Sequence, residues 1–318
     1  MSKSPNRQTK TLQPHPEELA QAVLKGDLRA AGQVLSLIDD RNPAAKTVLK
    51  QLYRHTGRAQ IIGITGSAGT GKSTLIGCMT AELRRRGKQV GVLTIDPTSP
   101  FTGGALLGDR IRMRDHFLDK GVFIRSLATR GHQGGLSSCV YEAAQLMDAM
   151  GKEYILIETI GIGQDQVDVS RVAHTVILVV APEGGDEIQG MKAGIMEVVD
   201  RVVINKADLP GAEEMFLNLH SALADRGVQI FKTSAQKNEG IAALVDDITK
   251  QDLSHANHKE RTFDLSRQQL MALVRDGLML RLGKKIGKDN VDSWARKIAA
   301  RQSDPYTAAE VILEELKL

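Results

Sequence analysis

A glycine-rich segment that ends in a lysine and a serine carries the clearest chemistry in the chain. It follows the apolar run Ile61–Thr65 and reads Gly66-Ser67-Ala68-Gly69-Thr70-Gly71-Lys72-Ser73-Thr74, which satisfies the pattern GxxxxGK[ST]. In this pattern the backbone N–H groups converge on a phosphate at a helix N-terminus, the lysine reaches the β- and γ-phosphate oxygens, and the serine hydroxyl ligates Mg²⁺. The segment therefore predicts a nucleoside triphosphate site with Lys72 as its cation and Ser73 as a metal ligand.

A second motif, Asn205-Lys206-Ala207-Asp208, indicates which base the site binds. It ends the apolar run Val202–Asn205, and Thr233-Ser234-Ala235 follows the next such run. An aspartate carboxylate accepts two hydrogen bonds from the N1–H and the exocyclic amine of guanine, whereas adenine offers no such pair of donors. We therefore predict that the nucleotide is GTP or GDP and that its base is contacted by Asn205, Lys206, Asp208, Ser234 and Ala235.

Carboxylates that could bind Mg²⁺ follow other apolar runs. Glu158 ends one run and precedes Gly161 by three residues, an arrangement in which GTPases hold the metal through water and sense the γ-phosphate. Asp96 and Asp109 lie in a long segment rich in glycine and proline, which is typical of a mobile loop. Each aspartate taken alone is more often a cap or turn residue. The predicted metal ligands are Ser73, Asp96, Asp109 and Glu158.

The residue that orients the attacking water is less obvious from the sequence. Many GTPases carry a glutamine directly after the glycine of this segment, but here the position holds Ile162, which can neither position nor activate water. Gln164 is the candidate substitute, with an ordinary loop glutamine as the alternative. We expect slow intrinsic hydrolysis by a catalytic set of Lys72, Asp96, Glu158 and Gln164.

The elements that position these motifs alternate between short apolar runs and amphipathic segments. The runs predict seven strands: Ile61–Thr65, Val90–Ile95, Val122–Ile124, Tyr154–Glu158, Val176–Val180, Val202–Asn205 and Gln229–Lys232. The segments between them predict helices over Ser73–Arg86, Leu136–Met150, Gln189–Val199, Glu213–Asp225 and Ile241–Lys250. Strands that are apolar on both faces belong to a parallel sheet covered by helices on both sides. The predicted fold class is α/β, a P-loop NTPase with a mostly parallel central sheet flanked by helices.

Helical extensions precede and follow this core in the sequence. Apolar residues recur at helical spacing from Pro16 to Gly57 and again after His255, where Gly283–Asn290 and Ser303-Asp304-Pro305 predict breaks. We predict three parts: an N-terminal helical extension over residues 1–58, a GTPase domain over 59–252 and a C-terminal helical segment over 253–318.

Composition argues against several other classes of protein. The 318 residues are 42% hydrophobic and 25% charged, and their net charge of +4 is too small to predict nucleic-acid binding. Cys78 and Cys139 are far apart and form no CxxC pair, which excludes a disulfide framework and a structural zinc site. The longest apolar run, Thr175–Ala181, is far shorter than the roughly 20 residues that span a bilayer. We expect a soluble, cytoplasmic protein that binds neither nucleic acid nor membrane.

These residues together resemble the MeaB/ArgK family of P-loop GTPases, which includes human MMAA. The most specific part of the resemblance is the run DPTSPFTGGALLGDR at residues 96–110. The resemblance covers nearly the whole chain, and its other parts are Gly26-Asp27, the phosphate loop, residues 158–164, residues 185–189 with Lys192, residues 205–208 and Asp304-Pro305-Tyr306.

The resemblance implies a GTPase that is a chaperone of an adenosylcobalamin-dependent acyl-CoA mutase, methylmalonyl-CoA mutase or a relative. It would gate cofactor loading and protect or reactivate the mutase. The resemblance also implies that Asp186, Gln189 and Lys192 belong to an additional switch that signals to this partner. Family members are usually homodimers built through their C-terminal helices, which would make residues 253–318 a dimerisation segment.

The sequence departs from the family pattern at two places. The family commonly reads Gly-Gln-Ser-Glu after its second switch, whereas this chain has Gly163-Gln164-Asp165-Gln166, and His174 stands where we expect an aspartate. We expect these changes to affect coupling to the partner more than nucleotide binding.

Three other functions are alternatives to this one. A nickel-insertion GTPase shares the fold but needs a cluster of cysteines or histidines near the switches, and the sequence shows none there. An ATP-using kinase linked to basic amino-acid transport conflicts with Asp208, which suits guanine. A scaffold with a decayed site conflicts with the presence of Lys72, Ser73 and Asp208.

Overall fold

The computed structural model describes residues 15–96, 116, 118–128, 136–159, 169–182, 193–250 and 256–315. The chain divides into two compact units, the first ending at Thr262 and the second beginning at Phe263. The N-terminal helices belong to the same unit as the central sheet. The domain limits at residues 58 and 252 stay predictions.

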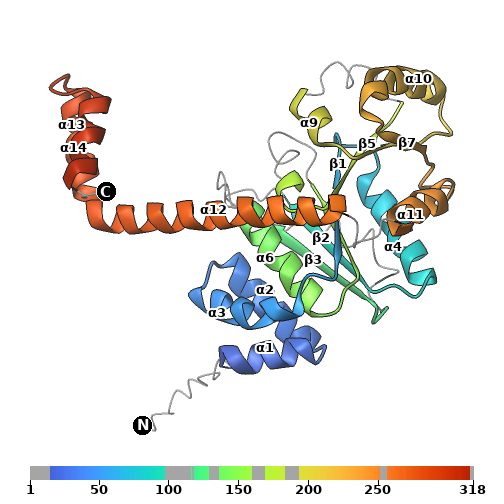
Figure 1. Cartoon of the computed structure of the whole chain (residues 1–318), viewed down its shortest axis with the longest axis horizontal. Helices are drawn as coiled ribbons and strands as arrows, with labels where there is room; N and C mark the ends of the chain where they lie inside the picture. The colour runs from blue at the N-terminus through green and yellow to red at the C-terminus, as the bar shows by residue number, and fades with distance from the viewer. Residues whose placement is uncertain are drawn as a thin grey trace, which may run out of the picture. The chain divides into compact units, whose positions relative to one another are not determined.

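A seven-stranded sheet forms the centre of the first unit (Figure 1). Its strands are β1 (Gln60–Thr65), β2 (Val90–Asp96), β3 (Val122–Ala128), β4 (Tyr154–Glu158), β5 (Thr175–Val180), β6 (Arg201–Ile204) and β7 (Gln229–Lys232). They lie in the order β3-β2-β4-β1-β5-β6-β7, and every neighbouring pair is parallel. All carboxyl ends therefore lie along one edge, where open α/β sheets bind ligands. The predicted α/β class is confirmed.

Strand β3 is longer than the sequence predicts, continuing past Ile124 to Ala128. It pairs with β2 along its whole length, although Arg125 and Ser126 interrupt the apolar pattern. The two polar side chains have partners, because the Ser126 hydroxyl lies 2.8 Å from that of Thr94 and Arg125 donates to Ser36 Oγ at 3.2 Å. The strand can continue through these residues because hydrogen bonds satisfy their polar side chains.

Helices cover both faces of the sheet and create two hydrophobic cores. Helices α4 (Lys72–Arg85) and α11 (Ile241–Lys250) pack on one face, and α6 (Leu136–Ala149), α9 (Ala193–Val198) and α10 (Ala212–Leu223) pack on the other. Side chains of β1 alternate between the two cores: Ile62 and Ile64 pack with α4, whereas Ile61 faces the opposite core. Two short 3₁₀ helices, η3 (Val169–Arg171) and η4 (Ala224–Arg226), lie in the connections.

The N-terminal extension consists of α1 (Pro16–Leu24), α2 (Leu28–Asp39), α3 (Pro43–Leu52) and the 3₁₀ turn η1 (Tyr53–His55). Asp27 caps α2 by accepting hydrogen bonds from the N–H groups of Arg29 and Ala30. Asn42 caps α3 by accepting one from the N–H group of Ala44. Helices α2 and α3 pack against α6, and their apolar side chains join the core on that face of the sheet.

The C-terminal helices are α12 (Ala256–Ile286), α13 (Lys288–Ala299) and α14 (Pro305–Glu315). The predicted break over Gly283–Asn290 is shorter in the structure, because α12 continues to Ile286 and only Gly287, with φ of 74°, separates it from α13. Asp304 precedes α14 and accepts hydrogen bonds from two N–H groups of its first turn. None of the helices among the described residues is long and apolar enough to cross a membrane.

A candidate nucleotide site at the carboxyl edge of the sheet

The phosphate loop connects β1 to α4, as its motif predicts. Gly66, Gly69 and Gly71 have φ values of 143°, 86° and 87°, which side chains rarely allow. A Cβ atom on Gly66 would lie 2.0 Å from the carbonyl oxygen of Val179, and one on Gly71 would lie 2.4 Å from Asn205 Nδ2. Glycine is therefore required both by the loop's conformation and by its close contact with neighbouring strands.

Lys72 lies at the first position of α4 with its ammonium group folded back against the loop. Its Nζ donates to the carbonyl oxygens of Gly66 and Ser67, each at 2.8 Å, and the residue is only 6% exposed. Thr70 closes the same turn by donating from its hydroxyl to Ser67 O at 3.0 Å. The loop therefore holds a positive charge at the N-terminus of α4, where the helix dipole also favours an anion.

Ser73 and Glu158 form the second part of the site. The Ser73 hydroxyl donates to Glu158 Oε1 at 2.5 Å, and both residues are 7% exposed. They meet because β4, which Glu158 ends, pairs directly with β1, which leads into the phosphate loop. A hydroxyl and a carboxylate are hard oxygen donors of the kind that Mg²⁺ prefers.

Asp96 is the predicted site residue on strand β2. Asp96 is the last residue of β2, whose neighbour is β4, so its backbone lies at the same sheet edge. Five further predicted residues lie outside the described part of the chain: Asp109, Gln164, Asp186, Gln189 and Lys192. Within the described ranges, no group of three histidine, cysteine or acidic residues is arranged to hold a metal ion.

Asn205 joins the phosphate loop to the predicted base site. Its Nδ2 donates to Thr70 O at 2.9 Å, while its Oδ1 accepts from Ala235 N at 3.1 Å and from the Thr233 hydroxyl at 3.2 Å. The side chain is buried, so these bonds satisfy an amide that would otherwise be costly to bury. The sequence motif predicted Asn205 in the base site but missed this structural role, which depends on a neighbouring strand.

Asp208 is the partly exposed carboxylate of the predicted base site. A hydrogen bond from Ser234 and a second from Lys237, whose Nζ lies 3.1 Å from Asp208 Oδ2, hold the pKa of the Asp208 carboxyl below its usual range. The group is therefore ionised at neutral pH and can accept hydrogen bonds. Asp208 and Ser234 line a cavity of about 450 Å³. Sequence reasoning missed Lys237, which follows the predicted Ser234 by three residues.

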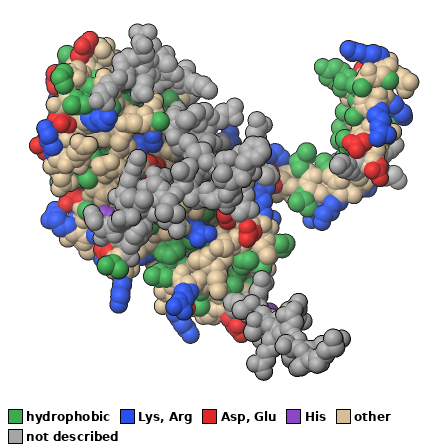
Figure 2. Space-filling model, turned by 180° about the vertical axis from the view of Figure 1, so that it is seen from behind, with side chains coloured by type: hydrophobic (Ala, Val, Ile, Leu, Met, Phe, Trp, Pro, Cys, Tyr) green, Lys and Arg blue, Asp and Glu red, His purple; other side chains and the backbone are tan. Residues whose placement is uncertain are grey.

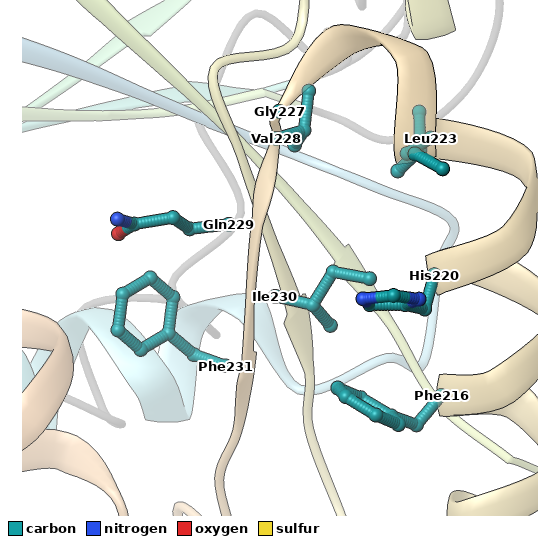
Figure 3. Close-up of a pocket in the computed structure, with 9 residues that line it drawn as sticks. Phe216, His220, Leu223, Gly227, Val228, Gln229, Ile230 and Phe231 are labelled. Carbon is teal, nitrogen blue, oxygen red and sulfur yellow. The ribbon is translucent and has the colours of Figure 1, made fainter.

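A second cavity, of about 400 Å³, lies between α10 and the edge strand β7 (Figure 3). Phe216 and His220 of α10 lie on the same side of β7 as Ile230, whereas Gln229 and Phe231 point to its other side. None of the predicted nucleotide residues lines this cavity. Its mostly apolar lining offers no phosphate-binding loop, so we do not assign the nucleotide to it.

Comparison with known proteins agrees with this geometry. The sequence profile described as methylmalonyl Co-A mutase-associated GTPase MeaB matches residues 31–286. The chain belongs to the MeaB family. The chain has a P-loop fold, and its relatives are described as GTPases. As a member of this family it is a GTP hydrolase.

Individual relatives resemble this MeaB-family chain along most of its length. A putative GTPase of Pyrococcus abyssi is 40% identical, over 94% of this chain and 96% of its own. The methylmalonic aciduria type A homolog, mitochondrial, of Caenorhabditis elegans is 38% identical, over 61% of this chain and 53% of its own. The solved structure of a LAO/AO transport system kinase superposes with a TM-score of 0.72 at 22% identity, covering 99% of this chain and 100% of that one. This last similarity shows a common fold.

His174, one of the two departures from the family pattern, has a structural role in this MeaB-family chain. Its ring Nδ1 accepts a hydrogen bond from the backbone N–H of Ile61 at 3.1 Å, and its backbone N–H donates to the carbonyl oxygen of Ile61 at 2.8 Å. An aspartate at this position would also offer an acceptor. His174 therefore fixes the start of β1, the strand that leads into the phosphate loop. Asp165 and Gln166 lie outside the described residues.

Proposed function

We propose that this MeaB-family GTPase is a chaperone of an adenosylcobalamin-dependent acyl-CoA mutase, methylmalonyl-CoA mutase or a relative. In this role it gates cofactor loading and protects or reactivates the mutase. One observation supports nucleotide binding in this proposal. The phosphate loop, the Ser73–Glu158 pair and the predicted base residues lie at one sheet edge, and Asn205 joins the phosphate loop to the base residues. The family description and the name of the C. elegans relative support the mutase as partner.

The chain's own residues bind and orient the nucleotide in this proposal. The N–H groups of the phosphate loop and the ammonium of Lys72 bind the β- and γ-phosphates, which places the positive charge where negative charge accumulates during phosphoryl transfer. Asp208 accepts hydrogen bonds from guanine, and Lys206, Ser234 and Ala235 form the rest of the base site. Gln164 remains the candidate for orienting water.

The donor set next to the phosphate loop fits Mg²⁺, because Ser73 and Glu158 offer adjacent oxygen atoms there. We infer that Ser73, Glu158, Asp96 and Asp109 hold the ion, directly or through water. When bound, Mg²⁺ neutralises negative charge on the phosphate oxygens. Asp186, Gln189 and Lys192 are proposed to couple the nucleotide state to the mutase.

The partner assignment is tested by steady-state GTP hydrolysis with and without a methylmalonyl-CoA mutase from the same source. We expect slow turnover alone, because Ile162 cannot orient water, and a rise of about tenfold or more when the mutase supplies or positions the missing group. Lys72→Ala mixed with the same mutase is the control for contaminating GTPases. Slow turnover that no adenosylcobalamin-dependent acyl-CoA mutase changes would contradict the chaperone proposal and leave the GTPase activity standing.

We also propose that the protein is a homodimer formed through its C-terminal helices. Leu270 and Leu278 of α12 are 60% and 45% exposed, and Val274 between them is also exposed. Their spacing of four residues places them on one side of the helix. Further large apolar side chains are exposed on these helices, and hydrophobic groups are visible along this segment in Figure 2. Apolar area of this kind is typical of an interface.

The dimer is tested by measuring molar mass in solution with light scattering. The double variant Leu270→Glu, Leu278→Glu should change the mass from that of two chains to that of one, because two charges would be buried without partners. Gln268→Glu is the matched control, since Gln268 is exposed on another side of α12. A wild-type protein with the mass of a single chain at micromolar concentration would refute the dimer.

A further inference from the structure

Cys78 connects α4, the helix that follows the phosphate loop, to Ala235 of the predicted base site. It follows Lys72 by six residues on α4, and its Sγ–H donates to the carbonyl oxygen of Ala235 at 3.2 Å. The N–H of Ala235 donates in the other direction, to Asn205 Oδ1 at 3.1 Å. Both backbone polar groups of Ala235 are therefore bonded to side chains, one from α4 and one that follows β6, and its carbonyl oxygen also accepts the backbone N–H of Asn238 at 3.3 Å.

Ala235 belongs to the base loop, which we define as residues 233–235. Its neighbour Ser234 hydrogen-bonds Asp208, the residue assigned to guanine recognition. Ala235 itself is buried in the hydrophobic core that α4 shares with the sheet, and Cys78 packs against that core. A continuous series of contacts thus runs from α4 through Cys78, Ala235 and Ser234 to Asp208.

The Cys78 thiol is protonated at neutral pH, as a hydrogen-bond donor must be. Burial raises the pKa of the Cys78 thiol above its usual value, so the sulfur keeps its proton at neutral pH and can donate to a carbonyl oxygen. Cys139, the other cysteine of the chain, is also partly buried, but it lies on α6 and contacts the N-terminal helices. It provides a matched control for thiol chemistry.

We propose that Cys78 is a positioning residue for base recognition in the nucleotide site. By fixing Ala235, it sets the place of Ser234 and through it the orientation of the Asp208 carboxylate. Phosphate binding on α4 and base binding on the base loop are thereby mechanically linked. This inference rests on the proposed guanine site.

Nucleotide affinity and selectivity of Cys78 variants test the inference. Cys78→Ala should release a fluorescent GDP analogue about threefold to tenfold faster than wild type, because one buried hydrogen bond is lost. It should also reduce the preference for GDP over IDP, since IDP lacks the 2-amino group that Asp208 would bind. Cys78→Ser, which keeps a donor, should restore both values, and Cys139→Ala should change neither.

The thiol also serves as a reporter. The chain has two cysteines, so Cys139→Ala leaves Cys78 as its only thiol. GDP should slow the alkylation of Cys78 by iodoacetamide about fivefold or more, because a ligand that binds only the folded site suppresses the local unfolding that exposes a partly buried thiol. The alkylated protein should then release GDP faster than the unmodified one.

Two results would overturn the inference. The first is an equal loss of GDP and IDP affinity in Cys78→Ala, which would indicate general loosening of the fold. The second is an alkylation rate that does not respond to GDP. Failure of the underlying site is distinguishable, because in that case Lys72→Ala and Asp208→Asn would bind GDP as wild type does. Thermal unfolding without nucleotide checks that each variant folds.

Discussion

Lys72→Ala should lower GTP turnover by at least about a hundredfold, the scale on which enzymes lose rate when one preorganised donor to the reacting group is removed. The ammonium group is nearly buried and is held by two carbonyl oxygens of the phosphate loop. Alanine would remove the charge-assisted hydrogen bonds that the ammonium group is proposed to make to the β- and γ-phosphate oxygens, leaving only the neutral N–H donors of the loop. Phosphate release measured under single-turnover conditions reports the loss directly.

The matched control for this variant is Lys88→Ala. Lys88 lies outside the phosphate loop and pairs with Glu153 at 2.9 Å on the protein surface. Its loss should leave turnover within about twofold of wild type, because exposed ion pairs contribute little. If Lys72→Ala retained full turnover while remaining folded, the assignment of the phosphate loop would be wrong.

Asp208→Asn should shift the preferred base from guanine to xanthine. The ionised carboxylate can only accept hydrogen bonds, and guanine offers it two donors, whereas an amide can also donate to the 2-oxo group of xanthine. The amide oxygen of asparagine can still accept one of these bonds without the charge, but its NH2 group would face the 2-amino group of guanine, donor against donor, so GDP affinity should fall about a hundredfold. Calorimetric titration with GDP, XDP and ADP measures all three preferences on one protein.

Asp225→Asn is the control for this substitution, since Asp225 lies in the exposed turn η4 and lines neither cavity described above. Its titration should match wild type. An unchanged preference for GDP in Asp208→Asn would move the base site elsewhere. Tighter binding of ADP than of GDP by wild type would contradict the guanine assignment and favour the kinase alternative.

Local sequence determined the parts of the site that are contiguous in the chain. Residues 66–74 form a strand-to-helix turn because glycines occupy the positions with positive φ and the preceding run is apolar on both faces. The central strands β1, β4 and β5 were predictable for the same reason, since burial on both sides leaves an apolar run, whereas the edge strand β3 continues past its apolar run through Arg125 and Ser126. The motifs that contain Lys72 and Asp208, with the apolar runs before them, predicted phosphate and guanine binding.

The tertiary structure decided which distant residues meet. Ser73 and Glu158 are 85 residues apart in sequence and meet because β4 is inserted between β2 and β1. The contact from Cys78 to Ala235 spans 157 residues and depends on the packing of α4 beneath the base loop. The order of the strands could not be predicted from the sequence. Consecutive parallel strands are linked by crossover connections, and the side of the sheet on which the next strand is added depends on which apolar faces pack together. Short-range backbone preferences are encoded by neighbouring residues, but long-range pairing is settled only when the whole core packs.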